Sequence, residues 1–264
     1  MERPSMTPPY VEGKNLLKDK SVLITAAAGA GIGFAAAKRA AEEGCKALMI
    51  SDIHEKRLEK AIDNLKKETN LPHIFGRICD VTKEDDVQHL TEQAEEYLGG
   101  IDILINNAGL GTTKNLIDME DQEWDTVLNV TLTGTMRMMR ACLKRMQTRK
   151  HGVIVNNASV LGWRAQKAQS HYAAAKAGVM ALTRCAALEA AEFGVRINAV
   201  APSLAIHPFL EKSAPKELLA ELEAKEAFGR GAKVWEVANV MMFLASDYSS
   251  YMTGEVLSCS SQHS

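Results

Sequence analysis

Short apolar runs alternate along the chain with longer stretches whose apolar residues recur at helical spacing. Seven of these runs predict buried strands, at residues 21–25, 47–51, 74–79, 101–105, 153–157, 196–200 and 255–257. Strands that are apolar along their whole length need helices on both faces, as in a parallel sheet. The alternation therefore predicts a doubly wound α/β fold, in which ligands bind beyond the carboxyl ends of the strands.

The chain length suits one domain. Its 264 residues, of which 46% are hydrophobic, can bury one large core. We expect this domain at 18–264, after an extended arm at 1–17 that is marked by Pro4, Pro8 and Pro9 and carries no secretory signal. Residues 203–233 interrupt the alternation with a segment marked by Pro and Gly that contains a short amphipathic helix, which predicts a lid or substrate loop.

Composition excludes several classes of function. The net charge of -2, with cations and anions interspersed, gives no basic stripe for nucleic acid. The sequence contains no run of about eighteen apolar residues, so we expect no membrane span. The five cysteines are far apart and odd in number, which favours reduced thiols in the cytoplasm. The seven histidines lack ligand spacing, so we expect no metal site.

Tyr172 and Lys176 are the first candidates for chemistry. They are four residues apart in an alanine-rich stretch, so they share one face of a predicted helix. A nearby ammonium should lower the pKa of a phenol, which is near 10 in isolation. Ser159, just after the 153–157 strand, offers a hydroxyl to the same substrate oxygen, at which Tyr172 would exchange a proton. Taken alone, the pair is also typical of a surface helix, and only the neighbouring motifs favour catalysis.

A glycine-rich turn follows the first strand and opens a helix of small residues. Gly29, Gly31 and Gly33 would let the backbone approach a diphosphate at the helix N-terminus. Nineteen residues after Gly33, Asp52 ends the second strand, where a carboxylate would bind an adenosine ribose and repel a ribose phosphate. With no cation at residues 30, 53 or 54, this favours NAD over NADP. The alternative is that Asp52 caps a helix before Glu55.

Polar residues also end the third and fourth strands. Asp80 and Val81 follow the third strand, and Asn107, Ala108 and Gly109 follow the fourth. In a doubly wound sheet this edge is where a nucleotide lies. Turn chemistry is the alternative, since Asn, Asp and Gly are frequent at such corners.

Taken in order over about 18–257, these motifs, together with residues 196–202, resemble the short-chain dehydrogenase/reductase family. The resemblance implies a Rossmann fold with a seven-stranded parallel sheet, hydride exchange with a nicotinamide, and a homodimer or homotetramer. It implies that Tyr172 is the acid/base, that Lys176 holds the nicotinamide ribose and tunes Tyr172, and that Ser159 positions the substrate oxygen. The cofactor contacts that it implies are Ala26, Gly29, Gly31, Ile32, Gly33, Asp52, Ile53, Asp80, Val81, Asn107, Ala108, Gly109, Val130, Tyr172, Lys176, Pro202, Ala205 and His207.

The sequence departs from the family pattern at several positions. Ala26 replaces a usual Gly and the turn is one residue longer, so we expect phosphate contacts to shift to Gly29. Thr131 stands where the family has a catalytic Asn, which bends its helix and helps to hold a water. A hydroxyl has one donor where an amide has two, so the proton relay is in question. His207 replaces a Thr, and we expect it to contact the cofactor or the lid backbone rather than to serve as an extra acid/base. The Ser-rich C-terminal tail from residue 258 is expected at a subunit interface.

The expected substrate contacts lie after Ser159 and in the lid: Leu161, Trp163, Leu204 and Phe209. Their apolar character indicates a bulky alcohol or ketone, either ring-bearing or an acyl thioester such as a coenzyme A ester. Arg164 and Lys167 either meet a coenzyme A phosphate or form a solvated pair.

Three functions are therefore carried forward. The first is an NAD-dependent secondary-alcohol dehydrogenase, similar to family members that degrade sterols and alicyclic rings in bacteria. The second is a 3-oxoacyl-thioester reductase of the fatty-acid type. The third is a binding or scaffold protein with impaired chemistry, which the departures at Thr131 and Ala26 suggest and the retained Ser159, Tyr172 and Lys176 oppose.

Overall fold

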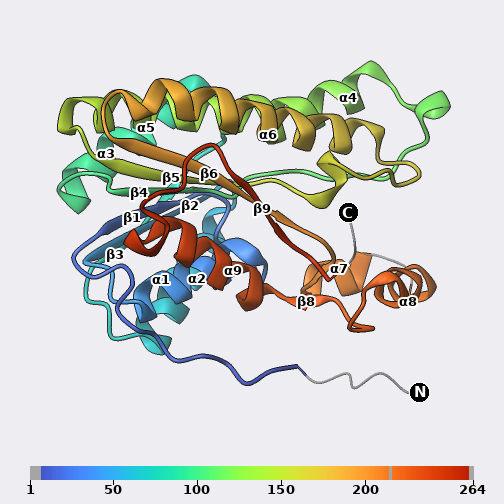
Figure 1. Ribbon diagram of the computed structural model, residues 1–264, viewed down its shortest axis with the longest axis horizontal. Coiled ribbons are helices and arrows are strands. Elements are labelled where there is room, and N and C mark those ends of the chain that lie inside the picture. Colours follow the sequence, from blue (N-terminus) through green and yellow to red (C-terminus); the bar gives the residue numbers. More distant parts are fainter. Residues whose placement is uncertain (1–6, 214–215, 262–264) are drawn as a thin grey trace.

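A seven-stranded parallel sheet forms the centre of the protein in a computed structural model, which describes residues 7–213 and 216–261 (Figure 1). The strand order is β3-β2-β1-β4-β5-β6-β9. Because the chain reverses direction across the sheet between β1 and β4, the carboxyl ends of these two strands flank a crevice. The strands are β1 Ser21–Ile24, β2 Ala47–Asp52, β3 Ile74–Ile78, β4 Ile103–Asn106, β5 Gly152–Asn157, β6 Val195–Pro202 and β9 Val256–Cys259.

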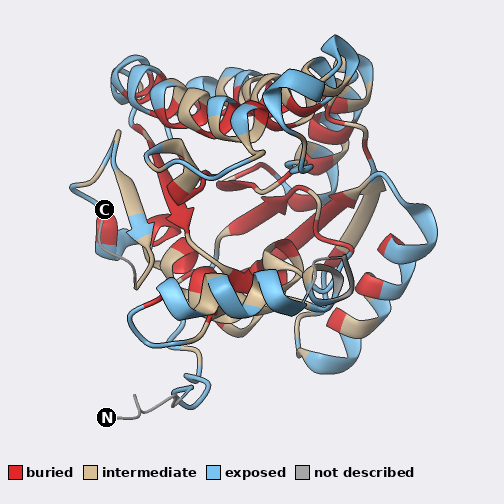
Figure 2. Ribbon diagram, turned by 90° about the vertical axis from the view of Figure 1, so that its right-hand side faces the viewer, coloured by how far each residue is buried: buried red, intermediate tan, exposed pale blue. Residues whose placement is uncertain are grey.

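Helices cover both faces of the sheet (Figure 1). One layer contains α1 Ile32–Glu42, α2 Glu55–Glu68 and α9 Val234–Ala245. The other contains α3 Glu84–Leu98, α4 Asp121–Leu128, α5 Gly134–Arg149 and α6 Ser170–Ala191. Successive strand residues point to opposite layers, so Leu23 and Ile24, both fully buried, belong to different core clusters. This is why the central strands are mostly apolar, and Figure 2 shows them buried between the helices, whereas the edge strands β3 and β9 are partly exposed.

The sequence located all seven strands of the sheet, and the fold is the predicted single-domain Rossmann fold. The observed ends differ from the predicted ones by at most two residues. Within the described residues, no helix has both the length and the apolar character that crossing a membrane requires.

The segment at 203–233 has more regular structure than the sequence predicted. The segment contains a short helix as predicted, and its described residues form a second one as well: α7 Pro208–Ser213 and α8 Lys216–Lys225 lie between the short parallel strands β7 Ala205–Ile206 and β8 Ala232–Lys233, which were not predicted. Two-residue strands leave almost no periodicity to detect. The described part of the C-terminal tail meets this segment, since Ser261 Oγ donates to the buried Glu226 at 2.6 Å. Residues 262–264 lie outside the described range, and the expected subunit interface stays a prediction.

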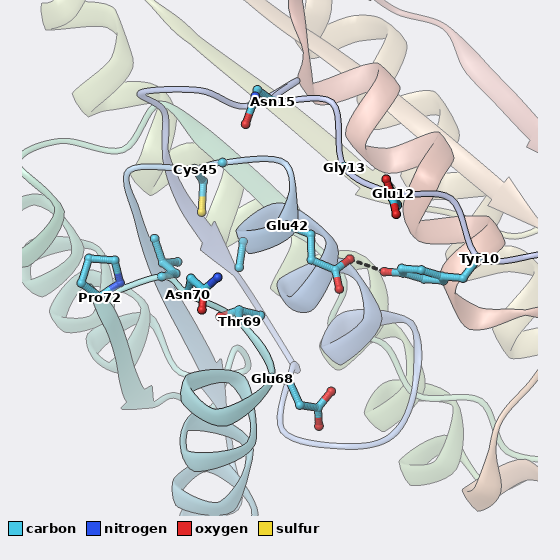
Figure 3. A pocket seen from close by; sticks show the side chains of 13 residues that line it. Tyr10, Glu12, Gly13, Asn15, Glu42, Cys45, Glu68, Thr69, Asn70 and Pro72 are labelled. Carbon is cyan, nitrogen blue, oxygen red and sulfur yellow. Dashed lines mark hydrogen bonds between the residues drawn. The ribbon is translucent and has the colours of Figure 1, made fainter.

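The N-terminal arm packs against α1. Arg39 and Glu43, both buried, form an ion pair of 2.6 Å, and Glu43 also accepts backbone hydrogen bonds from Lys14 and Leu16 of the arm. Residues 1–6 of the predicted arm lie outside the described range. Between the arm and the turn after α2 is a pocket of about 590 Å³, where Tyr10 hydrogen-bonds to Glu42 (Figure 3). None of its lining residues is a predicted site residue.

Candidate active site

Ser159, Tyr172 and Lys176 come together at the carboxyl end of β5. Tyr172 and Lys176 lie on α6, with the Lys176 Nζ 5.6 Å from the centroid of the phenol ring. Ser159 precedes the short helix η3 Val160–Gly162, and its Oγ accepts a hydrogen bond from Leu161 N at 3.2 Å. The Ser159 hydroxyl proton therefore remains for the phenol oxygen, with which Ser159 forms a hydrogen bond.

The electrostatics of this group differ from the sequence-based expectation in one respect. Burial raises the pKa of Tyr172, and only the hydrogen bond from Ser159 acts in the opposite direction. The sequence predicted a pKa lowered by Lys176. That direction is wrong for the cofactor-free protein, because desolvation of the phenolate is the largest effect. The phenol is thus held in its protonated form.

Lys176 is itself buried, with 3% of its surface exposed. Burial lowers the pKa of its ammonium to about 8. Its Nζ donates to the backbone oxygen of Asn157, and a Cβ on Gly109 would lie 3.4 Å from the same nitrogen. The ammonium thus lies close to Asn157 and Gly109, beside the ring of Tyr172.

Thr131 lies in a π-helical turn, η2 Asn129–Thr133, between α4 and α5. Its Oγ1 accepts from Leu110 N at 3.0 Å and donates to Leu110 O at 3.2 Å. The single hydroxyl proton is therefore used on the protein backbone and is not free for a water. The π-helical turn shows that the helix is irregular here with Thr in place of the family's Asn. Thr131 thus fixes the loop after β4, and the expected weakness of the relay at this residue stays a prediction.

The glycine-rich turn has the space that a diphosphate needs. A Cβ on Gly31 would meet nothing within 4 Å, and one on Gly29 would meet only backbone at 3.9 Å. Gly31 is the N-cap of α1, whose first turn has no acidic residue, so no carboxylate of that turn competes with an anion for the free amide groups. Gly33 is packed instead, because a Cβ there would lie 2.4 Å from Ala26 O. These residues fit the diphosphate of a dinucleotide, with Ile32 as the first residue of α1.

Ala26, where the family has a Gly, adopts a positive φ of 51°. This left-handed conformation costs an L-residue about 1 kcal/mol relative to Gly. The departure at Ala26 is therefore accommodated by local strain.

Asp52 ends β2 beside this turn. Its two oxygens accept from Ala28 N at 3.2 Å and from His54 N at 3.1 Å. The alternative interpretation as a helix cap is wrong, because the N-cap of α2 is His54. Burial raises the pKa of Asp52, and the charge of Arg57 acts in the opposite direction. Arg57 lies in the first turn of α2, three residues beyond the positions at which a cation was expected from the sequence.

The remaining motif residues at the sheet edge serve mainly as turn chemistry. Asp80 Oδ1 accepts from both the N–H and the hydroxyl of Thr82, at 3.0 and 2.7 Å. Asn107 Nδ2 donates to Thr25 O and Ala26 O, at 3.2 and 3.0 Å, and thereby ties β4 to the glycine-rich turn. Of the other predicted cofactor contacts near these turns, Val81 and Ala108 are buried, Val130 is half-buried, and Ile53 and Gly109 are exposed.

At the start of the predicted lid, Pro202 and Ala205 are buried and Leu204 is half-buried. His207 Nδ1 accepts from Leu210 N at 3.3 Å, and burial lowers the pKa of His207. The expected contact with the backbone of this segment is confirmed, and the expected contact with the cofactor stays a prediction. Leu161 is half-buried and Trp163 is 47% exposed near Ser159, whereas the side chain of Phe209 lies outside the described part of the chain.

Two site residues escaped the sequence analysis. Asn157 receives the Lys176 ammonium on its backbone oxygen and donates through Nδ2 to Asn107 Oδ1 at 2.9 Å. His171 is fully buried directly before Tyr172 and contacts Thr112. The adjacency of His171 to Tyr172 was visible in the sequence, but its burial was not.

Comparison with known proteins identifies the family of this chain. Residues 26–261 match the family model described as Enoyl-(Acyl carrier protein) reductase. The chain belongs to the short-chain dehydrogenase/reductase family and is an oxidoreductase.

Among its relatives is the (5R,7aS)-5-hydroxy-7a-methyl-1-oxo-2,3,5,6,7,7a-hexahydro-1H-indene-carboxyl-CoA reductase of Mycobacterium tuberculosis, 56% identical over 98% of both chains. A crystal structure of a short chain dehydrogenase from Mycobacterium smegmatis is 54% identical and superposes with a TM-score of 0.88 over 98% of this chain and 99% of that one. The structure of NAD⁺-bound xylitol dehydrogenase is 30% identical, with a TM-score of 0.88 over 93% of this chain and 99% of that one.

Proposed function

We propose that this enzyme interconverts a secondary ring alcohol and the corresponding ketone on a coenzyme A thioester, with NAD(H) as cofactor and Tyr172 as acid/base. The observation that carries the proposal is the Ser159–Tyr172 hydrogen bond beside the buried Lys176. The substrate class is supported by the mycobacterial relative, whose name contains a ring hydroxyl and a coenzyme A ester.

The cofactor supplies or accepts the hydride when it is bound. For this, Gly29 and Gly31 would hold the diphosphate, Asp52 the adenosine ribose, and Lys176 the nicotinamide ribose. NAD is favoured because Asp52 would repel a phosphate on that ribose, although Arg57 partly offsets its charge. NAD also occurs in the structural neighbour xylitol dehydrogenase.

The side chains of Ser159, Tyr172 and Lys176 serve the proton transfer. In ketone reduction, Ser159 donates a hydrogen bond to the substrate oxygen, and Tyr172 gives its phenol proton to that oxygen. The raised pKa of Tyr172 suits this direction, because burial keeps the donor protonated. In alcohol oxidation Tyr172 takes the proton, and the positive charge of Lys176 stabilises the phenolate.

The test combines nucleotide binding with turnover. NADH and NADPH are titrated by fluorescence, and a bicyclic ring alcohol is then offered as its coenzyme A thioester and as the free acid. We expect tighter binding of NADH, turnover of the thioester, and loss of turnover with retained NADH binding in Tyr172→Phe. Full turnover in Tyr172→Phe would remove the acid/base assignment. Preference for a linear 3-oxoacyl thioester would favour the fatty-acid type of reductase, and failure to bind either nucleotide would favour a scaffold protein.

We further propose that the protein is a homodimer or homotetramer. Large apolar side chains are exposed at Ile117 (92%), Leu188 (76%) and Tyr251 (104%), as is typical of surfaces that another subunit covers. Light scattering measures the oligomeric state, and a monomer at micromolar concentration would contradict this proposal.

A further inference from the structure

The loop that follows β4, residues 110–114, lies against the ring of Tyr172. A Cβ on Gly111 would lie 3.3 Å from two carbons of that ring, Cδ2 and Cε2. The loop backbone therefore contacts the phenol with no room for a side chain between them. A displacement of this loop would leave the ring free to shift.

Side chains next to Tyr172 in sequence hold this loop. Thr112 Oγ1 lies 2.7 Å from Nε2 of His171, the residue directly before Tyr172. Thr113 Oγ1 accepts from Gln169 Nε2 at 3.1 Å. Two consecutive loop residues thus bind two residues at the start of α6.

The two ends of the loop are held through backbone groups. At its start, Leu110 N and O both bond to the hydroxyl of Thr131. At its end, the N–H of Lys114 donates to Ala168 O at 2.9 Å. Only the middle of the loop therefore depends on side chains from α6.

Of these two side-chain bonds, the one to His171 matters more. The Gln169–Thr113 bond is exposed, where water competes with it. His171 has no exposed surface, and its Nδ1 has no hydrogen-bond partner among the described residues. The bond to Thr112 is therefore the polar interaction that orients the buried imidazole, and its loss would leave both ring nitrogens unsatisfied.

We propose that His171 is a positioning residue, which fixes the 110–114 loop through Thr112 and so keeps Tyr172 aligned with the substrate oxygen. This inference rests on the acid/base role proposed for Tyr172. Its physical basis is that the imidazole, buried beneath an exposed loop, gives that loop one short and partly buried hydrogen bond.

The test uses matched substitutions on both sides of the bond. His171→Gln keeps a nitrogen near the position of Nε2, and Thr112→Ser keeps the hydroxyl. His171→Asn and Thr112→Val remove the bond, and Thr112→Val does so from an exposed position that leaves the core intact. Hydrogen exchange at the amide of Lys114, which is protected by its bond to Ala168, reports the loop directly.

We expect exchange at Lys114 to be about tenfold faster in His171→Asn and Thr112→Val, the effect of losing one buried hydrogen bond. His171→Gln and Thr112→Ser should exchange at the wild-type rate. The double variant that combines His171→Asn with Thr112→Val should exchange no faster than either single variant. kcat should fall in His171→Asn and Thr112→Val and stay near the wild-type value in the Gln and Ser variants. The Kd for NADH should stay within about twofold in all of them, because the bond does not touch the glycine-rich turn.

Unchanged exchange in Thr112→Val, or single effects that multiply in the double variant, would overturn the inference whatever the substrate is. The expected exchange together with full turnover in Tyr172→Phe would contradict the proposed function instead.

Discussion

Lys176 carries a charge in the core without an opposing carboxylate. Its side chain is 3% exposed, and within the described part of the chain no Asp or Glu lies within ion-pair distance of its Nζ. Lys176→Met keeps most of the side-chain volume and removes the charge. We expect this variant to be inactive but more stable than the wild type in the absence of cofactor.

The size of the effect follows from the pKa. Burial lowers the pKa of Lys176 from 10.5 to about 8, which corresponds to a destabilisation of about 3 kcal/mol at neutral pH. The Met variant leaves the backbone oxygen of Asn157 without this donor, at a cost of about 1 kcal/mol. The variant should therefore gain about 2 kcal/mol in the free energy of unfolding.

The lowered pKa of Lys176 also makes the stability of the wild type depend on pH. Between pH 8 and 10.5 the unfolded chain holds a proton on Lys176 that the folded chain has released, so the stability of the wild type rises with pH across this window. The destabilisation is complete below pH 8 and disappears above 10.5. The advantage of Lys176→Met should therefore be largest near neutral pH and shrink as the pH rises toward 10.5.

Urea unfolding of the cofactor-free protein, at equal protomer concentration and about pH 7 and pH 10, measures this difference. Lys167→Met is the matched control, because Lys167 is exposed and its loss should change stability by less than about 0.5 kcal/mol. A less stable Lys176→Met at neutral pH, or an advantage that does not change with pH, would refute the reasoning.

Three further changes test other parts of the site. Ser159→Ala removes the bond that lowers the pKa of Tyr172, so the acid limb of the pH–rate profile for alcohol oxidation should move to higher pH, with kcat lower by about 10- to 100-fold. Gly33→Ala should lower the free energy of unfolding by about 3 kcal/mol, because its Cβ would overpack the turn. Gly31→Ala has open space at its Cβ, so it should be as stable as the wild type but bind NADH more weakly. Equal stability of the two variants in urea would contradict the packing at Gly33. Thr131→Val should lower the Tm, because it breaks two hydrogen bonds to the loop backbone, whereas Thr131→Ser should keep the wild-type Tm. Equal Tm values for the Val and Ser variants would show that the hydroxyl does not hold the loop.

The sequence by itself determined the sheet and the order of the motifs. Buried parallel strands must be apolar on both faces, so each run was visible as a continuous hydrophobic stretch. The positions of Tyr172 and Lys176 on one helix face, and of Gly31 at a helix N-terminus, depend only on local spacing. Such features follow from the helical period and from the chain geometry of a strand–turn–helix unit.

Only the tertiary structure decided how these groups are tuned. The raised pKa of Tyr172 comes from burial by segments distant in sequence, and only the hydrogen bond from Ser159 acts against it. Likewise, the Thr131 hydroxyl is used by Leu110, and His171 is buried beneath Thr112, because separate loops meet at the sheet edge. Desolvation and long-range hydrogen bonds depend on which segments pack together, and residue spacing along one chain does not record that.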